Sequence, residues 1–531
     1  MKKLPIGIQT FRKIIEGDYI YVDKTEYVYK LVDDAKHYFL SRPRRFGKSL
    51  LLDTIQEVFN GEKELFKGLF IYDTDYSFEK HPIIRFDMLN MENKSPELFE
   101  EAIMGKLINH AAAEEISTFG RSPGMVFESL LESLHKKYGK RVVVLIDEYD
   151  KPILDNIENT EIADANRQII RSVFNRLKSC DRNIEFTFIT GVSKFTKVSL
   201  FSDLNHLIDL TMSKEYAGIC GIPVEELGTY FGEYIKDLEN SDVLKNIDDI
   251  HDEILHWYDG YSWDGKSHLI NPFSLLNFFN EKRFYSFWFA SGSPSFLIKL
   301  FKNKPSSFLA LKDLSMSELA MDSFDIHNLS AVPLLFQTGY LTVKNVISEW
   351  GSSPFYAMEM PNREVSEAFN LQIIAGFTEA ELMTTQSMHG QIKTALETGE
   401  LQKIVPTLRS LFASIPYQLH VNAEAYYHSI FLAMMTLLNF EIHAELSVAG
   451  GSIDAVLELD DRVYVCEFKY VDCKHDASDE TKRKLFDKAL GDAINQIKEK
   501  GYSKKFEGSG KLIHHIALAF LGRDNIEMLA G

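Results

Sequence analysis

Three neighbouring residues near the start of the chain, Gly47, Lys48 and Ser49, have the types and the order that cradle a nucleotide. The stretch RPRRFGKS, residues 42–49, matches the second half of the pattern G-x-x-x-x-G-K-[ST], in which backbone N–H groups and a helix N-terminus surround phosphate groups. Lys48 would reach the β- and γ-phosphates, and Ser49 would hold Mg²⁺. On this motif alone, a nucleotide site and a positively charged helix start are about equally supported.

Arg42 stands where the pattern has its first glycine. An arginine cannot let the backbone approach a phosphate as closely as a glycine does. The side chains of Arg42, Arg44 and Arg45 could nevertheless replace part of the lost function through their positive charge.

A pair of acids, Asp147 and Glu148, follows an apolar run in RVVVLIDEYDKPIL, residues 141–154. Such a run favours a buried parallel strand, and a carboxylate at its carboxyl end could bind the Mg²⁺ of a nucleotide site, the role predicted for Asp147. Glu148 would then polarise the attacking water. A third run, IEFTFITGV, ends in Thr190, which we predict to be the polar sensor of the sheet. Solvated acids at a strand end are the alternative, but two such elements in this order favour nucleotide binding.

Two more carboxylates, Asp454 and Glu467, are predicted to face each other within GGSIDAVLELDDRVYVCEFKY, residues 450–470. The alternating apolar residues on either side of an Asp-Asp step predict a β-hairpin. A turn at residues 460–461 would make the two acids direct cross-strand partners, with Cβ atoms roughly 5 Å apart.

Facing carboxylates repel each other unless a cation lies between them, so the hairpin predicts a site for Mg²⁺, or for Mn²⁺. Lys469 lies two residues beyond Glu467 on the same strand face, where it could orient or deprotonate the attacking water. The alternative is a solvated network of Asp, Lys and Glu side chains, which would contribute little to stability.

The phosphate-binding residues need a strand before them and a helix after them. We predict a strand at residues 37–41 and a helix at residues 48–60, because Leu51, Ile55 and Val58 recur at helical spacing. Further along, EYAGICGIPVEELGTYF predicts a loop followed by a helix, and LLFQTGYLTV followed by PFYAMEMPNREV predicts a helix end and a β-wing.

The whole chain of 531 residues is too long for one core, and two to four domains are expected. Its net charge of −19 argues against a general nucleic-acid coat, because binding of that kind relies on Lys and Arg. No apolar stretch is long enough to span a bilayer, no secretory signal opens the chain, and the four cysteines form no C-x-x-C pair. We therefore expect a cytoplasmic protein without a membrane partner.

The N-terminal motifs together closely resemble the AAA-ATPase-like family of bacterial proteins. The resemblance rests on PIGIQTF, YIYVDKTEYVYKLV, YFLSRPRRFGKSLLLDTI, LFKGLFIYD, LIDEYDKPIL and ITGVSKF. It implies an α/β P-loop ATPase domain of the AAA/STAND type that uses ATP and Mg²⁺. Arg42 and Phe46 belong to the family's R-P-R-R-F-G-K-S opening, so we expect both in the nucleotide site. The helix and wing resemble the winged-helix end of this family, which more often serves as a lid than as a DNA contact.

The C-terminal motifs NAEAYYHSIFLAMM, GGSIDAVLEL, YVCEFKY and KALGDAINQIKEKGY resemble the PD-(D/E)XK nuclease superfamily. The resemblance implies that Glu424, on the helix before the hairpin, joins Asp454 and Glu467 as a metal ligand. It also places Gln496 on the following helix, and His428 shares a helix face with Glu424. Ser452 departs from the family, which usually has Arg there.

These patterns predict three domains: an ATPase domain at 1–214, a helical and winged-helix-like connector at 215–362, and a nuclease-like domain at 363–531. The leading hypothesis is an ATP-regulated or ATP-driven nuclease that acts on nucleic acid, in particular DNA, and that could form a homo-oligomer. One alternative is a nucleotide-sensing scaffold whose nuclease-like domain binds without cleaving. Another is a nuclease whose nucleotide loop has lost its function.

Overall fold

The chain forms two compact units, described here from a computed structural model. The described residues are 1–194, 206–241, 244, 247, 249–290, 314–321, 331–348, 354–378, 382–413, 431, 435, 441–448, 451–471, 478–521 and 525–531. The first unit comprises the described parts of Met1–Phe296 and Leu311–Val365, and the second comprises those of Ser366–Gly531. The first and second predicted domains thus lie in one unit.

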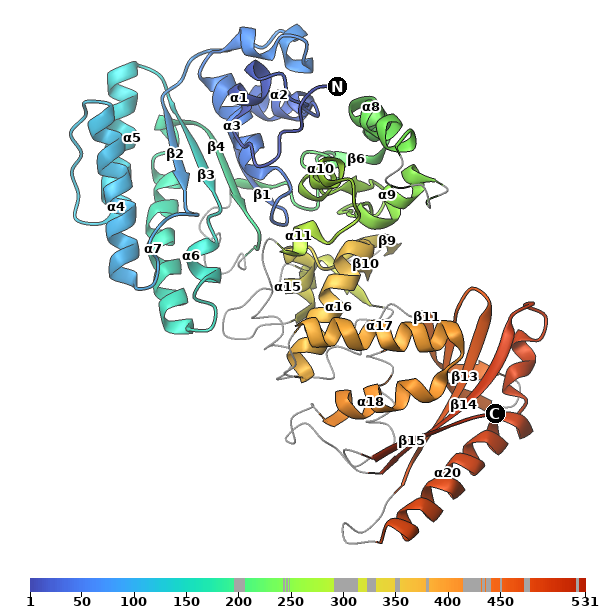
Figure 1. Cartoon of the computed structure of the whole chain (residues 1–531). Helices are drawn as coiled ribbons and strands as arrows, with labels where there is room; N and C mark the ends of the chain where they lie inside the picture. Colours follow the sequence, from blue (N-terminus) through green and yellow to red (C-terminus); the bar gives the residue numbers. More distant parts are fainter. Residues whose placement is uncertain are drawn as a thin grey trace. The chain divides into compact units, whose positions relative to one another are not determined.

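A five-stranded parallel sheet forms the centre of the first unit (Figure 1). Its strand order is β2-β3-β4-β1-β5, with helices α4, α5 and α7 together on one side and α1 to α3 on the other. The strands are β1 (His37–Ser41), β2 (Ile83–Asp87), β3 (Val142–Asp147), β4 (Ile184–Gly191) and β5 (Leu207–Asp209). The helices around them are α1 (Phe11–Glu16), α2 (Thr25–Asp34), α3 (Lys48–Phe59), α4 (Pro96–Ala113), α5 (Pro123–Tyr138), α6 (Lys151–Leu154) and α7 (Thr160–Ser179).

Burial explains why the predicted strands and the predicted helix form where they do. All six residues of β3 are buried, as expected for a central parallel strand covered on both faces. Leu51, Ile55 and Val58 are buried on one face of α3, which confirms the helix predicted at residues 48–60. The strand predicted at residues 37–41 is confirmed as β1.

The remainder of the first unit is a helical cluster and a small antiparallel sheet. The helices α8, α9 and α10 share one apolar core, and the small sheet has the order β8-β10-β9. Helix α15 followed by β9 and β10 confirms the predicted helix end and β-wing. The elements are α8 (Leu227–Glu239), α9 (Ile250–Tyr258), α10 (Pro272–Glu281), α11 (Phe287–Ala290), α14 (Glu318–Met321), α15 (Ala331–Thr338), β6 (Ile222–Pro223), β7 (Leu269–Ile270), β8 (Ser315–Ser317), β9 (Thr342–Ser348) and β10 (Phe355–Glu359).

The second unit is a mixed five-stranded sheet in the order β11-β12-β13-β14-β15. Helix α20 connects the parallel strands β13 and β14 and covers one face of the sheet with an apolar core. On the other face, the Tyr464 hydroxyl donates to the Leu396 carbonyl of α17. The elements are α16 (Arg363–Thr378, which begins in the first unit), α17 (Leu382–Thr398), α18 (Ile404–Ala413), α20 (Asp479–Glu499), β11 (Glu441–Val448), β12 (Gly451–Glu458), β13 (Arg462–Tyr470), β14 (Leu512–Leu521) and β15 (Asn525–Ala530).

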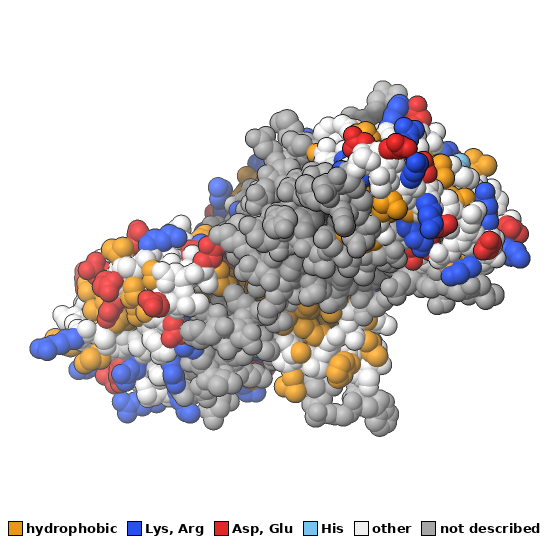
Figure 2. Space-filling model, turned by 90° about the horizontal axis from the view of Figure 1, so that it is seen from below, with side chains coloured by type: hydrophobic (Ala, Val, Ile, Leu, Met, Phe, Trp, Pro, Cys, Tyr) orange, Lys and Arg blue, Asp and Glu red, His pale blue; other side chains and the backbone are white. Residues whose placement is uncertain are grey.

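The surface carries charges of both signs. Figure 2 shows Lys and Arg side chains mixed with Asp and Glu side chains on the described parts of one face. Within the described ranges, no helix combines the length and the apolar character needed to cross a lipid bilayer.

Candidate functional site

The loop between β1 and α3 has the backbone shape of an anion-binding turn. Arg45 (φ 65°) and Gly47 (φ 97°) both adopt left-handed conformations, and α3 begins directly after them. Turns of this kind direct successive N–H groups into a concavity, and the helix N-terminus adds its partial positive charge. The loop therefore has the local geometry expected of a phosphate site.

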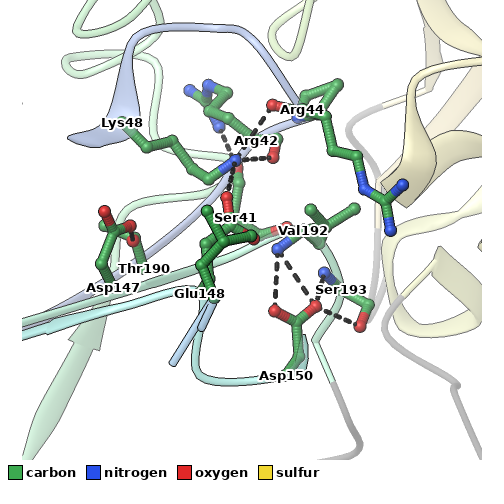
Figure 3. A network of polar contacts seen from close by, with 12 residues as sticks. Ser41, Arg42, Arg44, Lys48, Asp147, Glu148, Asp150, Thr190, Val192 and Ser193 are labelled. Carbon is green, nitrogen blue, oxygen red and sulfur yellow. Dashed lines mark hydrogen bonds and ion pairs between the residues drawn. The ribbon is translucent and has the colours of Figure 1, made fainter. Parts of the chain in front are cut away.

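Lys48 extends back across this loop (Figure 3). Its ammonium group donates hydrogen bonds to the carbonyls of Arg42 (3.0 Å) and Pro43 (3.1 Å) and lies 3.4 Å from the Glu148 carboxylate. The side chain is 3% exposed, so its charge is shielded from solvent and held between the loop and the end of β3.

The ends of β3 and β4 bring Asp147 and Thr190 into contact. These strands are parallel neighbours, so their carboxyl ends lie at the same edge of the sheet. The Thr190 hydroxyl donates to the Asp147 carboxylate over 2.6 Å, and both side chains are buried. The structure thus brings together residues predicted from three separate motifs: Lys48, Asp147, Glu148 and Thr190.

Arg42 has a different place from the one expected. Its guanidinium is fully buried, donates to the carbonyls of Ser41 and Thr211 (2.9 Å each) and lies 4.0 Å from the centre of the Trp263 ring. Burial lowers its pKa to about 10. The expectation that the Arg42 side chain would compensate for the missing glycine by charge is therefore corrected: this side chain holds the loop onto the protein core.

A cavity of about 370 Å³ opens beside the loop. It combines charged groups from the loop and the strand ends with apolar side chains from the N-terminal segment, α8 and α10, as a nucleotide with phosphates and a planar base would require. Its charged and polar lining includes Arg44, Arg45, Lys48, Ser49, Asp147 and Glu148, and its apolar lining includes Ile6, Ile8, Ile20, Val22, Phe46, Phe231, Phe273 and Leu276. The motif PIGIQTF had suggested a resemblance, but only the fold shows that it lines this cavity.

Sequence reasoning missed two residues beside the loop. The indole N–H of Trp288 donates to the Arg44 carbonyl over 3.0 Å. The buried Asp150 carboxylate accepts the backbone N–H groups of Val192 and Ser193 and the Ser193 hydroxyl, at 2.6–3.2 Å (Figure 3). Burial, and then the charge of Glu148, raises the pKa of Asp150 to about 6. The sequence gives no signal that distinguishes Asp150 from Asp147 and Glu148, the acids that precede it after the strand.

The hairpin of the second unit has the predicted register. Ala455 pairs with Cys466 and Glu458 with Val463, and the turn closes through a hydrogen bond from Leu459 N–H to the Arg462 carbonyl (2.9 Å). The pairing ends at the first of these pairs, so Asp454 lies one residue beyond it on β12 and Glu467 one residue beyond it on β13. The Asp454 carboxylate accepts the Phe468 N–H over 2.8 Å, which holds it against the partner strand.

Glu467 is a buried carboxylate with one oxygen paired and the other left without a partner. Its Oε1 lies 3.1 Å from the Lys469 ammonium and accepts the Gln496 amide, whereas Oε2 is buried and meets no hydrogen-bond donor of the described chain. Burial first, and then the charge of Asp454, raises its pKa to about 7, although Lys469 acts in the opposite direction. An unpaired, buried carboxylate oxygen beside a second carboxylate suits a divalent cation.

The sequence also predicts Glu424 as a metal ligand and His428 as its neighbour on one helix face. Glu424 and His428 lie outside the described residues. Within the described part of the chain, no group of three His, Cys, Asp or Glu side chains is arranged to hold a metal ion. Ser452 lies on β12 opposite Ser447. The metal shell with Glu424 therefore stays a prediction.

Comparison with known proteins gives two family matches and one relative that spans the chain. Residues 5–201 match a family described as predicted AAA-ATPase, and residues 422–528 match the PD-(D/E)XK nuclease superfamily. The chain is 35% identical over 526 residues to "Uncharacterized protein in vnfD 5'region" of Azotobacter chroococcum mcd 1, covering 98% of this chain and 96% of the relative. The parallel sheet is consistent with a P-loop NTPase, and the C-terminal α/β domain matches the nuclease superfamily. The chain belongs to the AAA-ATPase-like family and carries a C-terminal PD-(D/E)XK nuclease superfamily domain.

Proposed function

We propose that this protein is an ATP-regulated, Mg²⁺-dependent nuclease that hydrolyses phosphodiester bonds in DNA. The observation that carries the hydrolytic part is the buried Glu467 carboxylate, whose Oε2 meets no donor among the described residues, while the Phe468 N–H holds the Asp454 carboxylate against the same strand. Hydrogen bonding among the described residues leaves Glu467 Oε2 unsatisfied, and a cation with a bound phosphate would satisfy it.

In the nucleotide site, Lys48 would exchange its loop carbonyls for the β- and γ-phosphates of ATP, because a phosphate is the stronger acceptor. Arg44 and Arg45 line the same cavity and would add positive charge. Ser49 and Asp147 would hold Mg²⁺, which supplies charge neutralisation at the phosphates. Glu148 would be released from its ion pair with Lys48 and could then orient the attacking water.

In the nuclease site, Asp454 and Glu467 would hold the metal ion, Mg²⁺ or Mn²⁺, together with Glu424. When bound, this ion stabilises the charge that develops on the scissile phosphate. Gln496 and Lys469 both contact Oε1 of Glu467, so they direct the carboxylate and leave Oε2 for the cation. The Lys469 ammonium would also orient the water that attacks the phosphorus atom in line.

We infer that ATP acts as a switch, which either opens the nuclease site or assembles copies of the chain. A second candidate is a nucleotide-sensing scaffold whose nuclease-like domain binds nucleic acid without cleaving it. Ser452 favours this candidate, because the family usually has Arg there and the chain lacks that phosphate contact.

A cleavage panel separates these functions. Wild type, Lys48→Ala and Asp454→Ala would be incubated with single- and double-stranded DNA and RNA in Mg²⁺, with and without ATP. We expect wild type to cut DNA, Asp454→Ala to lose cleavage about 1,000-fold while still hydrolysing ATP, and Lys48→Ala to lose the response to ATP. Binding of nucleic acid without cleavage by wild type, under every condition, would support the scaffold instead.

A further inference from the structure

The C-terminal part of α20 lies on the same sheet face as the two carboxylates. Val463 and Val465 pack with Ile497 and Tyr502 in one apolar core. Alternate residues of a strand share a face, so Glu467 continues this row beyond the valines. The Gln496 amide reaches Glu467 directly, which shows that this flank of α20 borders the site.

Lys500 follows Gln496 by one helical turn and so lies on the same flank. Its side chain is exposed, and its ammonium group lies 5.6 Å from the centre of the Tyr502 ring. Its pKa is raised first by Tyr502 and then by the charges of Glu467 and Asp454, so the ammonium is within electrostatic reach of both acids.

The chain then turns at Gly501 (φ 61°) into a short 3-10 helix, Tyr502–Phe506. Tyr502 and Phe506 are buried, whereas Lys504 and Lys505 are exposed. The stem of Lys504 lies across Gly501, where an added Cβ would meet it at 3.2 Å. Lys504 is therefore next to Lys500 on the surface beside the site.

Lys500, Lys504 and Lys505, here called the lysine segment, are three exposed lysines at and just beyond the C-terminal end of α20. Among the described residues, none of the three forms an ion pair with a carboxylate. Five other lysines of the same unit do: Lys393 with Glu397, Lys403 with Glu400, Lys469 with Glu467, Lys484 with Glu480 and Lys511 with Glu458. Water solvates such exposed ammonium groups, so they require no partner, but in a chain with a net charge of −19 they place positive charge beside the two acids, where it is available to an anionic ligand.

We propose that the lysine segment binds the phosphodiester backbone of the nucleic acid next to the scissile phosphate, which rests on the proposed nuclease function. Lysines form point-charge contacts with phosphates and release counterions when they do so. The two aromatic rings of the short 3-10 helix, Tyr502 and Phe506, are buried and cannot stack on unpaired bases. The lysine segment would therefore recognise the charge of the backbone and not the base sequence.

The test measures binding of labelled 30-mers, as duplex DNA, single-stranded DNA and single-stranded RNA, to the full chain. An Asp454→Asn background keeps the substrates intact. Lys500, Lys504 and Lys505 are changed to Gln together, or to Arg together as the charge-preserving variant. The matched control changes Lys482, Arg483 and Lys488 to Gln, which removes the same charge from the other end of α20, up to about 27 Å away.

We expect the triple Gln variant to bind at least tenfold more weakly near 150 mM salt, and the slope of log affinity against log salt to fall by about 2 to 3. The triple Arg variant and the matched control should bind within about twofold of the background protein. Equal binding by the triple Gln variant and the matched control would overturn the inference, while cleavage by wild type would leave the proposed function standing. Failure of wild type to bind or cleave any nucleic acid would overturn both.

Discussion

Asp150 in the first unit and Glu467 in the second are both buried carboxylates at a candidate site, and their hydrogen bonds are satisfied in opposite ways. Asp150 is 0% exposed and accepts three donors from the loop after β4, so the protein itself completes its contacts. Glu467 is 1% exposed, and its Oε2 meets no donor of the described chain. Burial raises both pKa values, but only Glu467 is left with an unfilled contact. The comparison indicates that Asp150 supports the fold and that Glu467 is kept for a ligand.

The largest effect is expected from Asp150→Ala. The change leaves two backbone N–H groups and the Ser193 hydroxyl buried without acceptors, and the free energy of unfolding should fall by about 3 kcal/mol. Thermal or urea unfolding of the full chain, followed by circular dichroism, measures the loss.

Asp150→Asn keeps an oxygen where Oδ2 accepts all three contacts, so it should lose less than half as much. The exposed Asp33→Asn serves as the control and should change stability by less than about 0.5 kcal/mol. If Asp150→Ala is as stable as wild type, Asp150 does not stabilise the fold, and the distinction drawn between Asp150 and the ligand-binding Glu467 is wrong.

A smaller change in the free energy of unfolding, of opposite sign, is expected from Glu467→Gln in the absence of metal. Its pKa is raised from 4.5 in the unfolded chain to about 7, so the folded state holds the proton more tightly in that range. The stability contribution of this group is complete below pH 4.5 and is lost as the pH rises to about 7. Glu467→Gln should therefore be about 2 kcal/mol more stable than wild type at pH 8 in EDTA, and the difference should vanish near pH 4.5.

Mg²⁺ should reverse that order at pH 8, because it stabilises wild type and has no carboxylate to bind at position 467 in the variant. Unfolding curves at pH 4.5, 6, 7 and 8, with EDTA or Mg²⁺, would follow both effects. Identical pH dependence of the two proteins in EDTA would contradict the assignment.

The smallest effect is expected on ATP affinity, from a change beside the loop between β1 and α3. The Trp288 indole N–H holds this loop through the Arg44 carbonyl. Trp288→Phe removes the donor to the Arg44 carbonyl but keeps a ring against Tyr340. We expect ATP to bind about fivefold more weakly, a cost of about 1 kcal/mol, as measured by calorimetry.

Trp257→Phe is the matched control, since its indole donates to Glu253 (2.9 Å) away from the loop. Its affinity for ATP should equal that of wild type. Equal weakening in both variants would mean that the loss at Trp288 is a general effect on the fold.

Sequence patterns predicted features in which neighbouring residues set the geometry. The alternation around residues 460–461 predicted the hairpin register, because a strand turns successive side chains to opposite faces. The helical spacing of Leu51, Ile55 and Val58 predicted α3 for a similar reason. The placement of Arg42 and the contacts of Asp150 could not be predicted, because their partners come from distant segments.

The amino-acid sequence by itself determined which acids, lysines and glycines occupy strand ends and turns, since those positions follow from local periodicity along one chain. Only the tertiary structure decided which of these groups have their hydrogen bonds filled. Asp150 accepts from donors 42 and 43 residues away, while Oε1 of Glu467 accepts from Gln496, 29 residues away, and Oε2 meets no donor in the described part of the chain. Burial and hydrogen-bond saturation depend on segments that meet only after folding, and they distinguish a carboxylate that braces the fold from one that awaits a cation.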